Sequence, residues 1–235
     1  MRLHPLELAD LHIDALYERD AAGLVIASRD PHVTPPPFHL VRTRVGNRWL
    51  LSARLEPARR QLLASILARQ PPISDCTEEL PRPEAFAAMR SVLAEYSKSH
   101  GEYRGPAYFF PDELPNADQA ELLIDVSEVP ESGPFSWLRT FVASWHPIAV
   151  LRAADGTLAS VCHSARSTHG AAEAGVETVD EYRGRGYGST AVSAWAAAVR
   201  RGGRLPLYST SWVNTPSRAL ARRLGLVAYA EDFHV

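Results

Sequence analysis

The stretch EYRGRGYGST, residues 181–190, places three glycines among two arginines and two tyrosines. The interior of a helix or strand disfavours this glycine density, because glycine loses more conformational freedom on folding than any other residue. The residues that follow, AVSAWAAAVRR (191–201), are by contrast strong helix formers. The stretch therefore predicts a bare loop that opens directly into a helix near Ser189.

A helix start leaves several backbone N–H groups unpaired, and the aligned peptide dipoles give them a partial positive charge. Gly184, Gly186 and Gly188 lack Cβ atoms, so we expect these N–H groups to approach a phosphate or diphosphate closely. The loop is no P-loop, because it has no Gly-Lys-Ser/Thr, and it lacks the G-x-G-x-x-G spacing of a dinucleotide fingerprint. A glycine-rich turn without a ligand is the alternative interpretation.

Composition limits the class of protein. The chain has 235 residues, enough for one large or two small domains, and 46% of them are hydrophobic, which allows a buried core. The net charge of −2 argues against general binding to nucleic acid or anionic membranes. The N-terminus has no signal-peptide core, and no apolar run approaches the roughly 18 residues of a membrane span. We therefore expect a cytoplasmic protein with neither a nucleic acid nor a membrane as partner, and the Arg-, Ala- and Pro-rich usage is typical of a GC-rich bacterium.

Cysteine usage adds one expectation. Cys76 and Cys162 are the only cysteines and lie far apart in the sequence. Two cysteines do not make a disulfide framework, so we expect two buried or incidental thiols.

Patterning divides the chain into two regions. Before residue 105 we expect a helix over residues 3–20, a hairpin over 39–55 that turns at Gly46-Asn47, and two further helices over 56–70 and 83–100. After it we expect strands, a short helix, a hairpin and alternating strands and helices, over residues 105–111, 120–129, 134–145, 147–166, 172–179, 189–201, 205–212, 216–224 and 226–235. This order predicts an α/β fold with an N-terminal α+β region (1–104) and a C-terminal α/β region (105–235).

Two motifs together resemble the GNAT acetyltransferase superfamily. Residues 183–188 match R/Q-x-x-G-x-G/A, the loop with which that family binds the diphosphate of acyl-CoA. The segment WVNTPSRALARRLGL (212–226) resembles the family's strand-to-helix segment, with Asn214 in the Asn place and Gly225-Leu226 in the Gly-Phe place. The resemblance covers residues 147–235 and more weakly 105–146. It implies a GNAT-like mixed central sheet flanked by helices, with a smaller α+β region before it.

The resemblance also implies residue roles. The strand ending at residue 179 would be splayed from the next core strand, so that its backbone pairs with the pantetheine arm. Loop N–H groups would hold the diphosphate, and Asn214 would contact pantetheine. The implied binding residues for acetyl-CoA, the expected co-substrate, are Val176, Thr178, Arg183, Gly184, Arg185, Gly186, Tyr187, Gly188, Ser189 and Asn214. No metal is expected.

Catalysis by direct attack of an amine on the thioester needs a base for the amine and an acid for the thiolate. Glu173 and Glu177 are candidate bases, although either could be a solvated strand carboxylate. The sequence departs from the family at Ala221, where many members carry the tyrosine acid. Water, Ser217 or another tyrosine, such as Tyr208 or Tyr229, would have to donate the proton.

We therefore expect an acyl-CoA-dependent N-acetyltransferase with an unidentified amine acceptor. The alternative is a non-catalytic acyl-CoA-binding or regulatory module, which Ala221 favours, whereas the intact loop and Asn214 favour the enzyme. Arg218, Arg222 and Arg223 are interpreted as a solvated helix face, and a contact with the CoA 3′-phosphate is the alternative. The first hundred residues carry no chemical motif and could form a degenerate copy of the fold, a lid or the surface of a homodimer.

Overall fold

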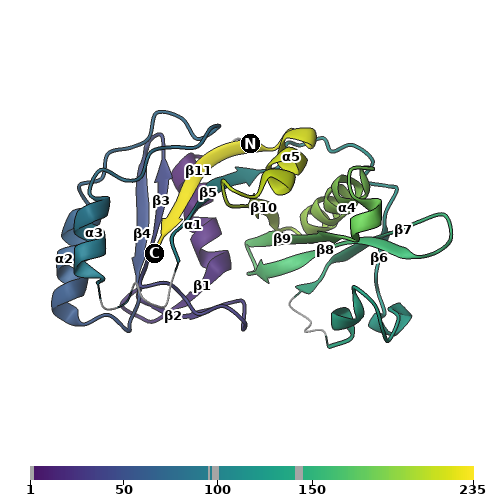
Figure 1. Ribbon diagram of the computed structural model, residues 1–235, viewed down its shortest axis with the longest axis horizontal. Coiled ribbons are helices and arrows are strands. Elements are labelled where there is room, and N and C mark those ends of the chain that lie inside the picture. Colours follow the sequence, from purple (N-terminus) through teal and green to yellow (C-terminus); the bar gives the residue numbers. More distant parts are fainter. Residues whose placement is uncertain (1–2, 95, 97–100, 141–144) are drawn as a thin grey trace. The chain divides into compact units, whose positions relative to one another are not determined.

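The computed structural model describes residues 3–94, 96, 101–140 and 145–235. They form two compact units (Figure 1). The first unit comprises Met1–Tyr108, Ser209–Thr215 and Ala228–Val235, and the second comprises Phe109–Tyr208 and Pro216–Val227. The chain therefore enters the first unit three times, and its last strand is part of that unit rather than of the glycine-loop region.

The first unit combines strands with helices. Its elements are α1 (Pro5–Leu16), β1 (Tyr17–Arg19), β2 (Val25–Ser28), β3 (Phe38–Thr43), β4 (Gly46–Leu51), α2 (Pro57–Leu67), α3 (Phe86–Val92), β5 (Tyr103–Phe109) and β11 (Val227–His234). Within it the strand order is β4-β3-β11-β5, and β3 is antiparallel to both β4 and β11. Helices α2 and α3 bury Leu63, Leu67 and Met89 against Phe38 and Phe233 of this sheet.

Several predicted elements of this unit differ from the structure. The predicted first helix ends at Leu16, because the chain becomes extended at Tyr17 and then turns at Asp20, whose carboxylate accepts the N–H groups of Ala22 and Leu24. The predicted hairpin is confirmed, but residues 44 and 45 make its turn and Gly46 pairs with Thr43 as the first residue of β4. The predicted helix over 83–100 is α3 over its middle part, and positions 95 and 97–100 lie outside the described residues.

The second unit contains the glycine loop. Its elements are β6 (Glu121–Leu122), the 3-10 helices η1 (Val126–Glu128) and η2 (Ser136–Thr140), β7 (Ile148–Arg152), β8 (Leu158–Ser167), β9 (Ala171–Thr178), the 3-10 helix η4 (Asp180–Tyr182), α4 (Tyr187–Arg201), β10 (Leu205–Ser209) and α5 (Thr215–Arg223). The strand order is β10-β9-β8-β7-β6, with β10 parallel to β9 and the other pairs antiparallel. This mixed sheet flanked by helices confirms the predicted α/β class.

Two predictions in this unit are wrong in detail. The expected strand over 120–129 is strand only at β6, because the carboxylate of Asp125 accepts the N–H of Ser127 and turns the chain into η1. The expected helix over 134–145 is the shorter 3-10 helix η2, and residues 141–144 lie outside the described part of the chain.

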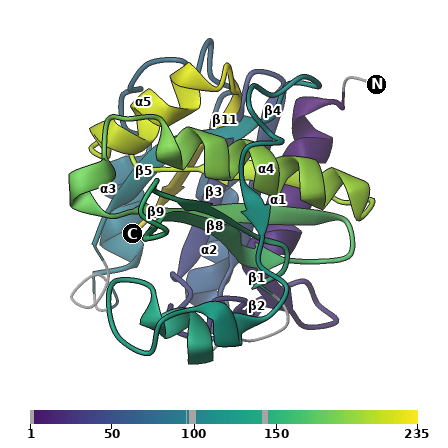
Figure 2. The ribbon, with the colours of Figure 1, turned by 90° about the vertical axis from the view of Figure 1, so that its right-hand side faces the viewer.

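The two faces of this second sheet are covered differently. Helix α4 lies along one face of β7, β8 and β9, where the indole of Trp195 donates to Ser164 Oγ at 3.1 Å (Figures 1 and 2). The segment around η1 and η2 covers the other face, where Leu123 and Leu138 pack against Ile148 and Val161. Cross-strand partners share a face of a sheet, so Glu177, the partner of Val161, lies on the face opposite α4.

Candidate functional site

The glycine loop ends in an uncapped helix start. Helix α4 begins at Tyr187, two residues earlier than expected, and its N-cap is Gly186 in the left-handed conformation, with φ of 91°. No side chain caps this helix, and the Ser189 hydroxyl donates to the Gly186 carbonyl at 2.8 Å instead. The backbone N–H groups of the first turn are therefore not taken up by a side-chain cap and remain suited to an anionic ligand.

The three glycines of the loop have different reasons to be glycine. Gly184 and Gly186 have φ of 75° and 91°, a region that residues with a Cβ disfavour. Gly188 is helical, but a Cβ there would lie 3.0 Å from Thr178 Oγ1 and 3.4 Å from Leu220 Cδ1. Gly188 thus allows α4 to pack closely on β9 and α5, whereas Gly184 and Gly186 shape the loop.

The arginines near the loop fall into two groups. Arg183 pairs with Asp180 at 2.8 Å and donates to the Thr178 carbonyl, and the Arg185 guanidinium lies 5.9 Å from the Tyr182 ring centre. Arg223, at the end of α5, instead places a guanidinium nitrogen 3.1 Å from where a Cβ of Gly186 would lie.

The place of Arg223 beside Gly186 is a feature that the sequence did not reveal. Arg223 is exposed, and within the part of the chain that the structure describes it makes no ion pair or hydrogen bond. Its positive charge lies beside the N-terminus of α4, which also carries a partial positive charge. The two repel each other unless an anion lies between or beside them. The sequence interpretation favoured a solvated face for Arg223 and could not place it beside the loop, because the two lie far apart in the sequence.

Strand β9 extends beyond its pairing with β10. The register between them runs from Leu205↔Ala171 to Leu207↔Glu173, while β9 continues to Thr178. On its other edge β9 pairs with β8 up to Ser160↔Thr178. The predicted binding positions Val176 and Thr178 therefore lie on the part of β9 beyond its pairing with β10, and their role in binding stays a prediction.

The two candidate bases lie on one face of β9 in different surroundings. Glu173 is buried, with an exposed fraction of 2%, and its carboxylate lies 3.6 Å from the Arg166 guanidinium. Glu177 is exposed to solvent along much of its side chain. Partial burial raises the pKa of the Glu177 carboxyl, and a hydrogen bond from Trp137 opposes that rise. Of the two, Glu177 is the accessible carboxylate.

Two of the candidate proton donors come together. The Tyr208 hydroxyl, on β10, and the Ser217 hydroxyl, on α5, are hydrogen-bonded at 2.6 Å. Ala221 is fully buried one turn further along α5. Tyr229 and Asn214 belong to the first unit, where the backbone N–H of Asn214 donates to the Ser211 carbonyl just before α5 begins.

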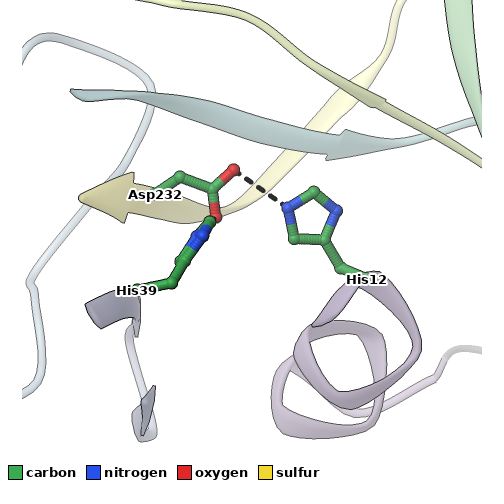
Figure 3. Close-up of side chains that lie close together, drawn as sticks. All are labelled: His12, His39 and Asp232. Atoms are coloured by element: carbon green, nitrogen blue, oxygen red, sulfur yellow. Dashed lines mark hydrogen bonds and ion pairs between the residues drawn. The ribbon is translucent and has the colours of Figure 1, made fainter. Parts of the chain in front are cut away.

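A second charged cluster lies in the core of the first unit (Figure 3). The Asp232 carboxylate binds the Nε2 atoms of His12 and His39 at 2.9 and 3.0 Å, and the Tyr17 hydroxyl contacts His39 Nδ1 at 2.8 Å. Burial by itself raises the pKa of Asp232, but the two imidazoles outweigh it and hold that pKa far below its usual range. These donor atoms lie within 4.8 Å of one another, so the same three residues are a group that could hold a metal ion.

No sequence signal pointed to this cluster. His12, His39 and Asp232 come from α1, β3 and β11, and neither their spacing nor their neighbours form a motif. Each Asp232 oxygen already has an imidazole partner, so hydrogen bonds account for the geometry without an ion.

The cysteines agree with the sequence expectation. Cys76 and Cys162 are both buried and free. Burial raises the pKa of Cys76 to about 11 and that of Cys162 well above its ordinary value, so both stay as thiols. Among the described helices, none is both long and apolar enough to cross a lipid bilayer.

Comparison with known proteins gives one match to a family model. A family model described as GNAT acetyltransferase matches residues 132–231. No curated protein matches the chain.

Solved structures add fold-level likenesses. A GNAT-family acetyltransferase from Novosphingobium aromaticivorans is 22% identical over 57% of this chain and 64% of its own length, with a TM-score of 0.45. A GCN5-related N-acetyltransferase-like protein from Streptococcus suis is 18% identical over 85% of this chain and 84% of its own, with a TM-score of 0.47. A conserved protein of unknown function from Staphylococcus epidermidis is 13% identical over 97% and 95%, with a TM-score of 0.49.

The sequence match spans the loop, α4, β10 and α5, which are the elements that carry both predicted motifs. This match confirms the resemblance to GNAT acetyltransferases that the glycine loop and the following helix predicted for the C-terminal half.

Proposed function

We propose that this chain is an acyl-CoA-dependent N-acyltransferase that transfers acetyl from acetyl-CoA to an amine in a ternary complex. The observation that carries the proposal is the uncapped start of α4 behind Gly186, beside the exposed cation Arg223. Backbone N–H groups and a cation at one point suit the diphosphate of CoA. The part of β9 beyond Glu173 would pair with the amides of pantetheine.

The residues of this unit can supply both proton transfers. Glu177 is the favoured base, because it is accessible and its raised pKa brings it closer to that of a base working near neutral pH. The amine nitrogen, once deprotonated, attacks the thioester carbonyl, and the carbon–sulfur bond breaks to release CoA thiolate. The hydrogen-bonded pair Tyr208–Ser217 is the favoured source of the proton that the thiolate takes up.

The proposal is tested in two steps with the full chain. Calorimetry with CoA measures binding, and a thiol reagent then follows CoA release from acetyl-CoA across a panel of amines. We expect CoA binding together with amine-dependent release. Protein that is folded but shows no affinity for CoA contradicts the proposal.

The same experiment separates the non-catalytic alternative. Ala221, where many GNAT members carry the tyrosine acid, favours that alternative. Binding of CoA without release on any amine would assign the chain to it. The Tyr208–Ser217 pair favours the enzyme, because it offers a proton donor that replaces the missing tyrosine.

A further inference from the structure

We propose that Trp137, Trp145, His163 and Glu177 form the acceptor subsite, and that the acceptor is a cationic amine with an apolar or aromatic body and no carboxylate of its own. This inference rests on the proposed transferase function and names its substrate class. All four residues belong to the second unit, and each is at least partly exposed.

Three rings lie together over one face of the sheet. The ring centre of His163 lies 5.2 Å from that of Trp137 and 5.5 Å from that of Trp145, and the two indoles are 5.6 Å apart. His163 lies against β9 at Gly175, where a Cβ would be only 2.6 Å from its Cε1 atom. The glycine at 175 is therefore what allows the ring to approach β9 closely.

A carboxylate completes this aromatic surface. Glu177 is two residues beyond Gly175 on the same strand and the same face, and its neighbour Trp137 acts to lower the pKa of its carboxyl. This face is opposite α4, so an acceptor bound here leaves the loop and the start of α4 to CoA. The backbone of β9 beyond Glu173 lies between the two.

The charged groups on this face of the sheet favour an acceptor with a positive charge. Aromatic faces attract ammonium groups, and a carboxylate beside them adds a second attraction. Glu177 and Glu173 lie on this face, and the nearby cation Arg166 is paired with Glu173. An acceptor with its own carboxylate would meet Glu177 without a free cation among these residues to offset it. A cationic amine fits both features of the surface.

Tyramine and tyrosine test the class directly, because they share the phenol and the amine and differ by one carboxylate. We expect kcat/KM for acetylation of tyramine to exceed that for tyrosine at least about tenfold. Equal rates, or faster tyrosine, overturn the inference. If neither is acetylated, calorimetry of tyramine with CoA-saturated protein decides: binding supports the subsite, and no binding overturns it.

Variants localise the subsite. Trp137→Leu should raise KM for tyramine about tenfold while the affinity for CoA stays unchanged. Trp137→Phe keeps an aromatic ring, so its KM for tyramine should lie between that of Trp137→Leu and that of the natural protein. This second variant keeps the test usable if Trp137→Leu is unstable. Trp49→Leu, the same change in the first unit, is the control. An unchanged KM in both Trp137 variants overturns the inference, whereas loss of CoA binding by the natural protein instead overturns the transferase function.

Discussion

Two groups of charged side chains, one in each unit, lie in opposite surroundings. In the first, Asp232 is buried between His12 and His39, and Glu231 is buried against Arg42 and Trp212. In the second, Arg223 is exposed beside the uncapped start of α4, and Glu177 is exposed on β9. Buried charges must be paired, so they serve the fold, while accessible ones remain for ligands.

This contrast separates stability from activity. Removing a partner from a buried pair leaves an uncompensated charge in the core, which is costly. Removing an exposed cation or carboxylate costs little stability. Substitutions at the buried charges Asp232 and Glu231 should therefore act on folding, and those at the exposed Arg223 and Glu177 on binding and rate.

The largest effect is expected at Asp232. Asp232→Asn removes the charge that both imidazoles face, and should lower the free energy of unfolding by about 3–5 kcal/mol. Urea unfolding followed by circular dichroism measures it. Asp14→Asn, in an exposed pair with Arg19, is the control and should cost less than about 1 kcal/mol. Similar losses in both variants would break the contrast.

Asp232 should also make the folded protein less stable at acidic pH. Asp232 has a pKa far below its ordinary value of about 3.9, so the unfolded chain binds a proton there that the folded chain does not. Its contribution is therefore complete above about pH 5 and is lost as the pH falls below the ordinary value. Asp232→Asn should flatten this acid fall in unfolding curves measured between about pH 5 and pH 2, and an unchanged fall would assign it to other carboxylates.

Glu177 should give the largest effect on rate. Glu177→Gln should lower kcat about 100-fold, because a general base contributes at least that much. Since the pKa of Glu177 is raised, the acidic limb of kcat/KM should lie above the ordinary glutamate value of about 4.3 and vanish in the variant. The same pH profile measured for Glu173→Gln decides between the two candidate bases. If the acidic limb is lost only in the Glu173 variant, Glu173 is the general base.

A smaller effect is expected in the glycine loop. Gly186→Ala places a Cβ on a residue with φ of 91° next to Arg223, and should weaken CoA binding about tenfold. Gly203→Ala is a matched control, because Gly203 has φ of 74° and open space around it, at the opposite end of α4. It should cost similar stability and leave CoA affinity unchanged. Equal affinities of the two variants for CoA would place the diphosphate elsewhere.

Arg223 should show the smallest effect. Arg223→Gln should weaken CoA binding about threefold to tenfold at low salt and less at high salt, because an exposed cation is screened. Arg222→Gln, the neighbouring exposed residue of α5, should change little. Repeating the titration with dephospho-CoA distinguishes the phosphates: a loss that persists assigns Arg223 to the diphosphate, as its place beside Gly186 predicts.

The loop and the helices were predictable because their signals are local. The glycines, the helix formers after them and the Asn214 segment all act within one or two turns of chain. The strand expected over 120–129 was wrong because another local signal competed with it. The side chain of Asp125 caps η1 and ends the extended segment that the apolar pattern predicted. The domain boundary at residue 104 stays a prediction, and the last strand shows why it was hard to place: Ala228–Val235 pairs within the first unit although it follows the glycine loop in sequence.

By itself, the sequence determined the α/β class, the GNAT resemblance of the C-terminal half and an uncapped helix start behind a glycine loop. Tertiary structure decided which distant groups meet: Arg223 with Gly186, Tyr208 with Ser217, Trp137 with Glu177, and His12 and His39 with Asp232. The reason is that helix starts and turns depend on neighbouring residues, whereas these meetings depend on strand register and helix packing, which only the folded sheet fixes.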